Sequence, residues 1–540
     1  MVQPSAWNGT AAARRAFPLL AWLSAVSFVA LTAYLSVRLT QAAAAEASWA
    51  DRAMSVVLLA AELLVGFHAV GFFASVARAS AARARRADPA FAPFTRSGVA
   101  VLVAAYNEAE EVLDETMAAA TALDYASAHL YLLDDSTRPE CRAAAERIAA
   151  RYGATLVTRP HRAGYKAGAI NELLPRLSEP YVAILDADQR PVRTWLTEVV
   201  PALDADPGLA FVQAPQVYTN LDGLPVARAS QHRQSVFFEY ICEGKSLVNA
   251  MFCCGSNVVF RRAALLSLRA EVAGRVHYLD ETSVTEDFAT SVKLHARGWR
   301  TLYRNHPYVL GLGPETLAAY FVQQMRWAMG TLGIGLQLLR SFLRHPRMLT
   351  AAQWWEYALS GSYYFTGLAN LAFMAAPAAF VVFGVHPVRL GVHVYLLLMV
   401  PQIGFNLGLF LVAMRLRGVP PPAAWLATAL AFSTFWTYTR AAVTALLGLR
   451  RPFGVTPKGV GGVLPLRGLL PELTALAVSV ACVLAAVVHV AVAGPDLAYL
   501  VNGFWAAYNA VQLSTLFVHF NRPVAVALRP SAFRPIPLRA

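Results

Sequence analysis

The chain has 540 residues, of which 57% are hydrophobic and only 15% are charged. Soluble proteins carry about 25% charged residues, so this composition favours a membrane protein and argues against a soluble enzyme. The net charge of +13 comes largely from arginines beside apolar runs, which indicates contacts with anionic lipid rather than a nucleic-acid-binding surface. The five cysteines include no CxxC pair, which argues against a zinc site or a disulfide framework.

Apolar runs long enough to cross a bilayer lie in two groups, before residue 90 and after residue 346. The run 425–449 is interrupted by Arg440 and followed by basic residues, so we expect it to lie along the membrane surface as an amphipathic helix. With six other runs as spans, the arginine clusters and residues 98–346 all face the cytosol, as the positive-inside rule requires. The expected spans are 17–37, 54–76, 357–383, 392–414, 473–492 and 497–520.

Residues 98–346 have the pattern of a soluble α/β domain. Short apolar or β-branched runs alternate with helical stretches such as 142–151, which predicts βαβ units and a mainly parallel sheet. Ligands of such sheets bind beyond the carboxyl ends of the strands, where Asp134-Asp135 and Asp186-Ala187-Asp188 both fall. The expected strands are 99–105, 130–133, 155–158, 182–185 and 210–213.

Asp186 and Asp188 can present two carboxylates on one side of a strand end. Mg²⁺ or Mn²⁺ takes hard oxygen ligands from one or two carboxylates, with the rest from phosphate and water. An isolated pair of this kind usually forms a turn or a cap, but the strand-end position favours a metal site. Asp134-Asp135-Ser136 repeats the arrangement one unit earlier, and it either holds a nucleoside or forms an N-cap or Asx turn.

Two further motifs carry charge near these pairs. Lys166 can reach a pyrophosphate as a point charge, although an isolated lysine is more often a surface residue. Thr285-Glu286-Asp287 precedes a helical pattern, so Thr285 is a candidate cap. A carboxylate at the same place can also accept the proton of an acceptor hydroxyl if the two lie within hydrogen-bond reach.

Gln323-x-x-Arg326-Trp327 places Gln323 and Trp327 on one face of a helix, at positions i and i+4. The face of a tryptophan ring stacks well on a sugar ring. The alternative is a tryptophan at the membrane interface, with Arg326 extending its charged head to water.

These motifs together resemble those of the processive family 2 glycosyltransferases, which include cellulose synthases, other β-glucan synthases, hyaluronan synthases and chitin synthases. The resemblance covers nearly the whole chain and follows the order of the family's motifs. The matching segments are Tyr106-Asn107-Glu108, Asp134-Asp135, Asp186-x-Asp188, Cys254-Gly255-Ser256, Thr285-Glu286-Asp287, Gln323-x-x-Arg326-Trp327 and a gating loop at Phe453-x-Val455-Thr456-x-Lys458-Gly459.

The resemblance implies a multi-span α-helical membrane protein with an inserted cytosolic α/β domain of the GT-A, Rossmann-like type. It implies a bacterial inner-membrane location, Mg²⁺ or Mn²⁺ as cofactor, and Asp287 as the general base within Thr285-Glu286-Asp287. The residues implied to bind donor or nucleotide are Tyr106, Glu108, Asp134, Asp135, Lys166, Asp186, Gln323 and Arg326, with metal on Asp186 and Asp188. The residues implied to bind the acceptor are Trp327, Cys254 and Gly255, and those of the gating loop are Phe453, Val455, Thr456 and Lys458.

The implied activity is the processive, inverting transfer of sugar from a UDP-sugar, with UDP-glucose as the expected donor and a cellulose-like or other β-glucan as the exported product. The expected partners are the UDP-sugar, the growing polysaccharide, membrane lipid and a periplasmic export protein, with no nucleic acid. We also expect no cyclic di-GMP-binding domain, since the chain ends at Ala540, soon after the last span.

Several alternatives to this activity remain. The polymer can be hyaluronan-like or chitin-like, the enzyme can be a non-processive lipid glycosyltransferase, or the chain can be a non-catalytic transporter or scaffold. Ala105 replaces the family's threonine before the Tyr-Asn-Glu motif, and Cys253 replaces a phenylalanine of the Phe-Phe-Cys-Gly-Ser loop. Residues 241–250 also lack the Gln-Arg-Gly-type sequence of bacterial cellulose synthases. These departures argue against cellulose itself.

Overall fold

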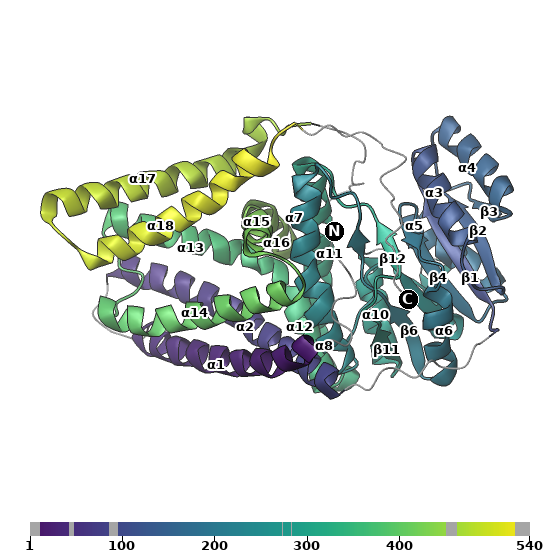
Figure 1. Ribbon diagram of the computed structural model, residues 1–540, viewed down its shortest axis with the longest axis horizontal. Coiled ribbons are helices and arrows are strands. Elements are labelled where there is room, and N and C mark those ends of the chain that lie inside the picture. Colours follow the sequence, from purple (N-terminus) through teal and green to yellow (C-terminus); the bar gives the residue numbers. More distant parts are fainter. Residues whose placement is uncertain are drawn as a thin grey trace.

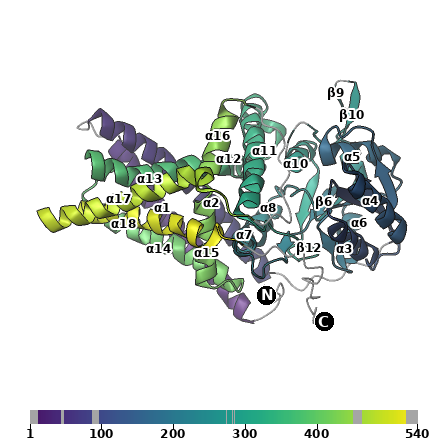
Figure 2. The same cartoon turned by 90° about the horizontal axis from the view of Figure 1, so that it is seen from above.

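The computed structural model describes residues 11–42, 48–85, 96–272, 274–281, 283, 285–449 and 462–523. These residues form an elongated molecule with long helices at one end and an α/β domain at the other (Figure 1). Two helices, α7 (Pro225–Val236) and α11 (Leu317–Arg344), lie at the junction of the two regions, as a second view also shows (Figure 2). The expected gating-loop residues Phe453, Val455, Thr456 and Lys458 lie outside the described residues.

A seven-stranded sheet forms the centre of the α/β domain. Its strands lie in the order β11 (Arg300–Tyr303), β6 (Leu209–Gln213), β8 (Val258–Arg261), β4 (Tyr181–Asp186), β1 (Val99–Ala105), β2 (Ala128–Asp134) and β3 (Thr155–Thr158). All neighbouring pairs are parallel except the two that β8 makes with β4 and β6. The predicted mainly parallel sheet is therefore confirmed, and each expected strand coincides with an observed one to within two residues at either end.

The register of the sheet brings the two acidic pairs to one edge. Ala105 of β1 pairs with Asp134 of β2, and Ala104 pairs with Asp186 of β4. Both faces of β1 are buried, because Val99, Val101 and Val103 face one layer of helices while the alternate residues face the other. The strands are covered on one face by α3 (Glu110–Thr121), α4 (Pro139–Tyr152) and α6 (Trp195–Ala205), and on the other by α5 (Tyr165–Leu173), α9 (Arg262–Leu266) and α10 (Glu286–Ala296).

Two small sheets complete the α/β domain. Their strands are β5 (Arg190–Pro191), β12 (Val309–Gly311) and β7 (Val217–Tyr218) in one, and β9 (Ala270–Val272) and β10 (Arg275–His277) in the other. After α7, one wider helical turn (Phe237–Ile241) leads into α8 (Cys242–Ser246), which packs against the second long helix.

Five helical segments of the described chain are long and apolar enough to cross a membrane, by length and composition. They are Ala16–Gln41 in α1 (Ala11–Ala42), Trp49–Arg83 in α2 (Trp49–Arg85), Ala351–Phe383 in α12 (Ala351–Ser362) and α13 (Thr366–Phe383), Val392–Leu416 in α14 (Val392–Leu416), and Leu466–Ala493, which contains α17 (Leu470–Ala493). The sixth expected span forms α18 (Leu497–Thr515) and a wider turn, Leu516–Phe520. It is not among the five, and Asn502, Asn509 and Gln512 lower its hydropathy, so its crossing stays a prediction.

The run 425–449, expected as one helix, forms two short helices instead. These are α15 (Pro421–Phe432) and α16 (Phe435–Leu446). At the break, the Ser433 hydroxyl donates to the Ala429 carbonyl at 2.8 Å and the Thr434 hydroxyl donates to the Ala431 carbonyl at 2.5 Å. Such side-chain bonds to the preceding turn compete with the regular helix, which accounts for the break. The placement of this segment along the membrane surface stays a prediction.

Helix α12 belongs to the membrane region but is bonded into the α/β domain. The Lys245 ammonium donates to the Glu356 carboxylate at 2.9 Å and to its carbonyl at 2.8 Å, and both side chains are almost fully buried. Arg78 of α2 pairs with the same carboxylate. At the next residue of α12, the Tyr357 hydroxyl lies 2.7 Å from His295 Nδ1 of α10. Buried ion pairs and hydrogen bonds therefore join the membrane region to the α/β domain.

Candidate active site

A cavity of about 350 Å³ lies at the carboxyl ends of β1 and β4. We refer to it as the sheet-edge cavity. Its wall brings together residues from motifs that span more than 200 positions of sequence. The sequence-predicted residues that line it are Tyr106, Glu108, Asp135, Lys166, Asp186, Asp188, Cys254, Gly255, Thr285, Glu286, Asp287, Gln323, Arg326 and Trp327.

Lys166 lies among the carboxylates of this cavity. Its ammonium donates to Asp186 Oδ1 at 2.9 Å and to the Gly255 carbonyl at 2.9 Å, and it lies 3.8 Å from the Glu286 carboxylate. Burial alone would lower the pKa of Lys166, but the charges of Asp186 and Glu286 raise it above the usual value. Lys166 therefore stays cationic at neutral pH, next to the expected metal-binding pair.

Asp287 lies in the first turn of α10, and its Oδ1 accepts a hydrogen bond from the Phe288 amide at 2.8 Å. Burial and the neighbouring charge of Glu286 raise the pKa of Asp287 to about 7, against the opposing effect of Lys166. A carboxylate with a pKa near neutrality suits a general base. Thr285 occupies the N-cap position, but its side chain makes no capping hydrogen bond.

The loop that carries Cys253, Cys254 and Gly255 passes beside Asp287. The Cys253 amide donates to the Ser291 hydroxyl of α10 at 2.8 Å, which ties the loop to the helix. Gly255 has φ +90°, and a Cβ at this position would lie 3.1 Å from Asp287 Oδ2. A glycine is needed here both for the backbone conformation and for the room that the carboxylate takes.

The two residues of the first acidic pair have different environments. Asp135 lines the cavity, and Arg159 binds it with two hydrogen bonds of 2.9 Å and 2.5 Å. Asp134 is buried and its Oδ1 accepts a hydrogen bond from the Ser136 amide at 3.1 Å, which is the Asx turn considered from the sequence. The structure does not place Asp134 on the cavity wall, so its expected contact with a nucleoside stays a prediction.

Two arginines after β3 contribute to the site, and the sequence motifs did not identify them. Arg159 clamps Asp135 and also donates to the Ala163 and Tyr165 carbonyls, each at 2.9 Å, which fixes the loop before Lys166. The Arg162 guanidinium carbon lies 3.3 Å from the centre of the Tyr106 ring. Their position directly after a strand, at the same edge as both acidic pairs, was the signal that could have identified them.

Helix α11 presents Gln323, Arg326 and Trp327 to the opposite wall of the cavity. The side-chain oxygen of Gln323 is buried without a hydrogen-bond partner among the described residues. Burial raises the pKa of the neighbouring Tyr218 to about 12, so this phenol stays neutral and able to donate. A buried acceptor without a partner is costly, and a ligand hydroxyl would satisfy it.

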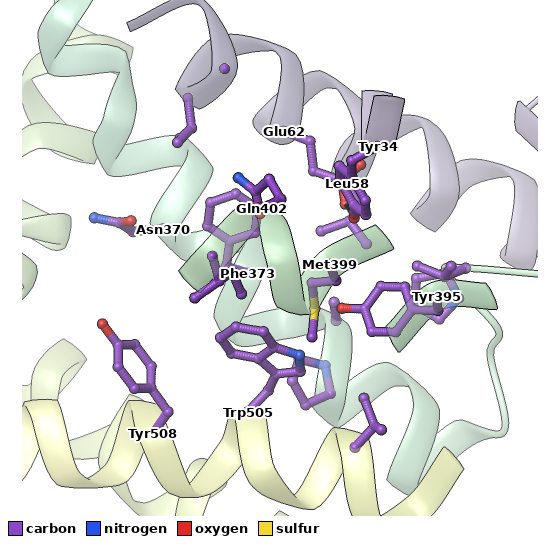
Figure 3. A pocket seen from close by; sticks show the side chains of 18 of the residues that line it. Tyr34, Leu58, Glu62, Asn370, Phe373, Tyr395, Met399, Gln402, Trp505 and Tyr508 are labelled. Atoms are coloured by element: carbon purple, nitrogen blue, oxygen red, sulfur yellow. Dashed lines mark hydrogen bonds between the residues drawn. The ribbon is translucent and has the colours of Figure 1, made fainter. Parts of the chain in front are cut away.

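A second cavity, of about 990 Å³, lies among the long helices. We refer to it as the membrane cavity. Aromatic and amide side chains converge on it from several helices, including Phe373, Tyr395, Gln402 and Trp505 (Figure 3). The carboxylate of Glu62 also lines it, but Glu62 is bonded by Arg38 at 2.9 Å and by Tyr34 at 2.6 Å.

The residues of the sheet-edge cavity fit a divalent cation that is shared with a ligand. Among the described residues no three His, Cys, Asp or Glu side chains form a self-sufficient metal cage. Mg²⁺ and Mn²⁺ do not need one when phosphate is present, because one or two carboxylates complete the set with phosphate and water. Asp186 and Asp188, both on the cavity wall, provide such a pair.

Two family models match the chain over overlapping segments. Residues 96–330 match the model described as "Glycosyltransferase like family 2", and residues 270–430 match the model described as "Cellulose synthase". The first segment contains every predicted residue of the sheet-edge cavity. These matches and the mixed α/β sheet confirm the predicted fold class, a GT-A domain inserted between membrane helices.

Named relatives agree with these matches. The cellulose synthase catalytic subunit [UDP-forming] of Pseudomonas fluorescens (strain SBW25) is 31% identical over 374 residues, which are 67% of this chain and 47% of the relative. The protein of the same name from Xanthomonas axonopodis pv. citri (strain 306) is 36% identical over 43% of this chain and 31% of the relative. The alignments thus cover less than half the length of both relatives.

Among solved structures, a mannosyltransferase from Pyrobaculum calidifontis in complex with GDP-Man and Mn²⁺ is 19% identical, with a TM-score of 0.48. The match covers 74% of this chain and 100% of that one.

Proposed function

Since residues 96–330 belong to the family 2 glycosyltransferases, we propose that the chain is a processive, inverting transferase that polymerises the sugar of a UDP-sugar. The donor that we propose is UDP-glucose, and the product is a β-linked glucan. The relatives named as UDP-forming cellulose synthase catalytic subunits support this choice of donor. The observation that carries the proposal is the gathering of basic side chains, two strand-end carboxylates, a buried carboxyl group of raised pKa and a tryptophan around one cavity.

The diphosphate of the donor would lie against Lys166 and Arg326. Lys166 already holds Asp186 at 2.9 Å, so its charge is positioned at the strand end where the phosphates would bind. A divalent cation on Asp186 and Asp188 would neutralise negative charge on the leaving diphosphate. On the far side, Arg162 and Tyr106 stack on each other and offer a flat surface to the nucleoside.

Transfer would proceed as a single displacement. Asp287 would accept the proton of the acceptor hydroxyl as the new bond from that oxygen to the anomeric carbon forms. The bond from the same carbon to the diphosphate oxygen breaks, and UDP leaves with the electron pair. Attack on the face opposite the leaving group inverts the configuration, so an α-linked donor gives a β-linked product. Trp327 would stack on the terminal sugar of the acceptor.

The membrane cavity would hold the product as it leaves. We place the α/β domain in the cytosol and the helices in the bacterial inner membrane, following the distribution of arginines. The uncharged amides and aromatic rings of the membrane cavity suit the hydroxyl groups and apolar ring faces of a sugar chain. A periplasmic export partner would receive the polymer.

Product analysis tests this proposal directly. The full chain, purified into lipid nanodiscs with Mg²⁺, would be incubated in turn with UDP-glucose, UDP-N-acetylglucosamine and UDP-glucuronic acid. We expect UDP release and an insoluble or high-mass glucan with UDP-glucose alone, degraded by a β-glucanase. Release of UDP with only a glycolipid product would refute processive polymerisation, and polymer from UDP-N-acetylglucosamine alone would refute the choice of donor.

A further inference from the structure

A single arginine ties together the helices that separate the two cavities. Arg233 of α7 donates through Nη1 to the Tyr320 hydroxyl and, at 3.1 Å, to Gln324 Oε1. Through Nη2 it donates to the Tyr438 hydroxyl at 2.6 Å and to the Tyr363 hydroxyl at 3.3 Å. We call these five residues the neck cluster. They come from α7, α11, the turn Tyr363–Phe365 and α16.

The neck cluster borders the membrane cavity directly and is joined to the sheet-edge cavity through helix α11. On α11, Tyr320 and Gln324 face Arg233, while Gln323 and Trp327, on a neighbouring face, line the sheet-edge cavity. On the other side, Tyr363 and Tyr438 line the membrane cavity. In the part of the chain that the structure describes, no residue lines both cavities. The helices of the cluster also lie at the junction of the two regions in both views (Figures 1 and 2).

The partners of Arg233 are unusual for a largely enclosed cation. All four are neutral, three phenols and an amide, and no carboxylate lies within ion-pair distance among the described residues. Enclosed arginines are normally paired with a carboxylate, which holds them in place. Neutral oxygens hold a guanidinium less tightly, and the hydroxyl and ring oxygens of a sugar are acceptors of the same kind. If sugar oxygens replaced the phenol and amide oxygens, Arg233 would make the same number of hydrogen bonds.

The aromatic rings of the neck cluster, with the neighbouring Tyr364, add a second feature of a sugar site. The Tyr364 ring packs edge-to-face on Tyr438 with centroids 4.8 Å apart, and the Tyr363 ring lies 6.4 Å from Tyr438. Tyr438 also donates to Gln324 Oε1 at 2.5 Å, so its hydroxyl is both donor and acceptor. A sugar unit has hydroxyl groups around its edge and an apolar face. Tyrosines suit both, because the phenol hydroxyl can form hydrogen bonds and the ring can pack on the apolar face.

From this arrangement we propose that the neck cluster is a binding subsite for a neutral sugar unit of the growing chain, between Trp327 and the membrane cavity. When the subsite is empty, Arg233 and the tyrosines bond to one another and close the passage. When the chain enters, Arg233 donates to sugar oxygens instead and retains the chain between rounds of transfer. Arg233 thereby sets the length of the product. This inference rests on the proposed polymerase function.

Chain length measured separately from catalysis tests the subsite. Parent protein, Arg233→Gln and Tyr438→Phe would be purified into nanodiscs and supplied with UDP-glucose. The initial rate of UDP release and the length distribution of the glucan would be measured in the same reaction. For Arg233→Gln we expect UDP release within about twofold of the parent and a mean length about tenfold lower, because loss of charge-assisted hydrogen bonds speeds release of the chain. Tyr438→Phe removes one hydroxyl and keeps the ring, so a smaller shortening is expected.

Arg228→Gln is the matched control. Arg228 lies on the same helix but is exposed, and it pairs at 3.8 Å with Asp222 at the surface. Arg228→Gln should change neither the initial rate of UDP release nor the length of the glucan. Normal chain length from Arg233→Gln would overturn the subsite and leave the polymerase intact. Parallel loss of UDP release, thermal stability and length would also overturn it, because the role would then be structural. Absence of polymer from the parent would refute the proposed function and this inference together.

Discussion

Gly255→Ala is the substitution that most directly tests the geometry around Asp287. At φ +90° an alanine is strained by about 1–2 kcal/mol, which is the cost of the left-handed region for a residue with a Cβ. The new Cβ would also lie 3.1 Å from Asp287 Oδ2 and 3.8 Å from Lys166 Nζ. The first separation is shorter than an ordinary carbon–oxygen contact, so the carboxylate must move by a few tenths of an ångström.

Two separate losses follow from these values. Stability should fall by about 1–2 kcal/mol from the backbone alone. Sugar transfer should fall further, by about tenfold, because misplacement of a reacting group by ~1 Å can cost ~10²-fold and this displacement is smaller. Thermal unfolding measures the first loss, and the initial rate of UDP release from UDP-glucose measures the second.

Gly153→Ala supplies a control with the same backbone strain and no crowding. Gly153 has φ +62° at the end of α4, and a Cβ there would meet no heavy atom within 4 Å. Both alanine variants should lose similar stability, while only Gly255→Ala should lose activity beyond that. Equal activities for the two variants would refute the claim that the loop positions Asp287.

Other predictions concern the base and the metal. Asp287→Asn should bind UDP normally but form polymer about 10²–10⁴-fold more slowly, and a near-normal yield would exclude Asp287 as the base. Because the pKa of Asp287 is raised to about 7 and the base must be deprotonated, the parent's kcat/KM should rise about tenfold from pH 6 to pH 8. A flat profile over this range would contradict that role. EDTA should abolish transfer, and Mg²⁺ or Mn²⁺ should restore it. Asp188→Asn should raise the metal concentration needed for half-maximal rate. Full activity of chelated, metal-free protein would rule out a role for the metal.

The parts of the fold that depend on local pattern could be predicted from the sequence. Apolar runs located β1, β2 and β4, and the acidic residues at the ends of β2 and β4 located the edge at which the cavity lies. The choice between Asp134 and Asp135 could not be predicted, because it depends on the direction of the chain in one turn. The break between α15 and α16 was also missed, since the apolar pattern continues through it.

Contacts between residues far apart in the sequence could not be predicted, for a different reason. Arg233 and Tyr438 are separated by 205 positions, and no periodicity relates them. Arg159 was missed although it directly follows β3, because only the acidic residues at the strand ends were taken as candidates there. The contact between Arg233 and Tyr438 is identified only once the helices are packed, since it depends on which elements meet.

The bonding of Glu356 to Lys245 bears on how the protein can be handled as a fragment. A fragment that stops near residue 346 contains the whole sheet and all fourteen predicted residues of the sheet-edge cavity, yet it lacks Glu356. Lys245 would then be an enclosed ammonium without its counter-ion, and loss of one partner of a buried ion pair costs about 3–5 kcal/mol. Tyr357, which packs against His295, would be lost as well. A truncated transferase domain should therefore express poorly or unfold readily, and Lys245→Met is the first substitution to try if that domain is to be crystallised alone.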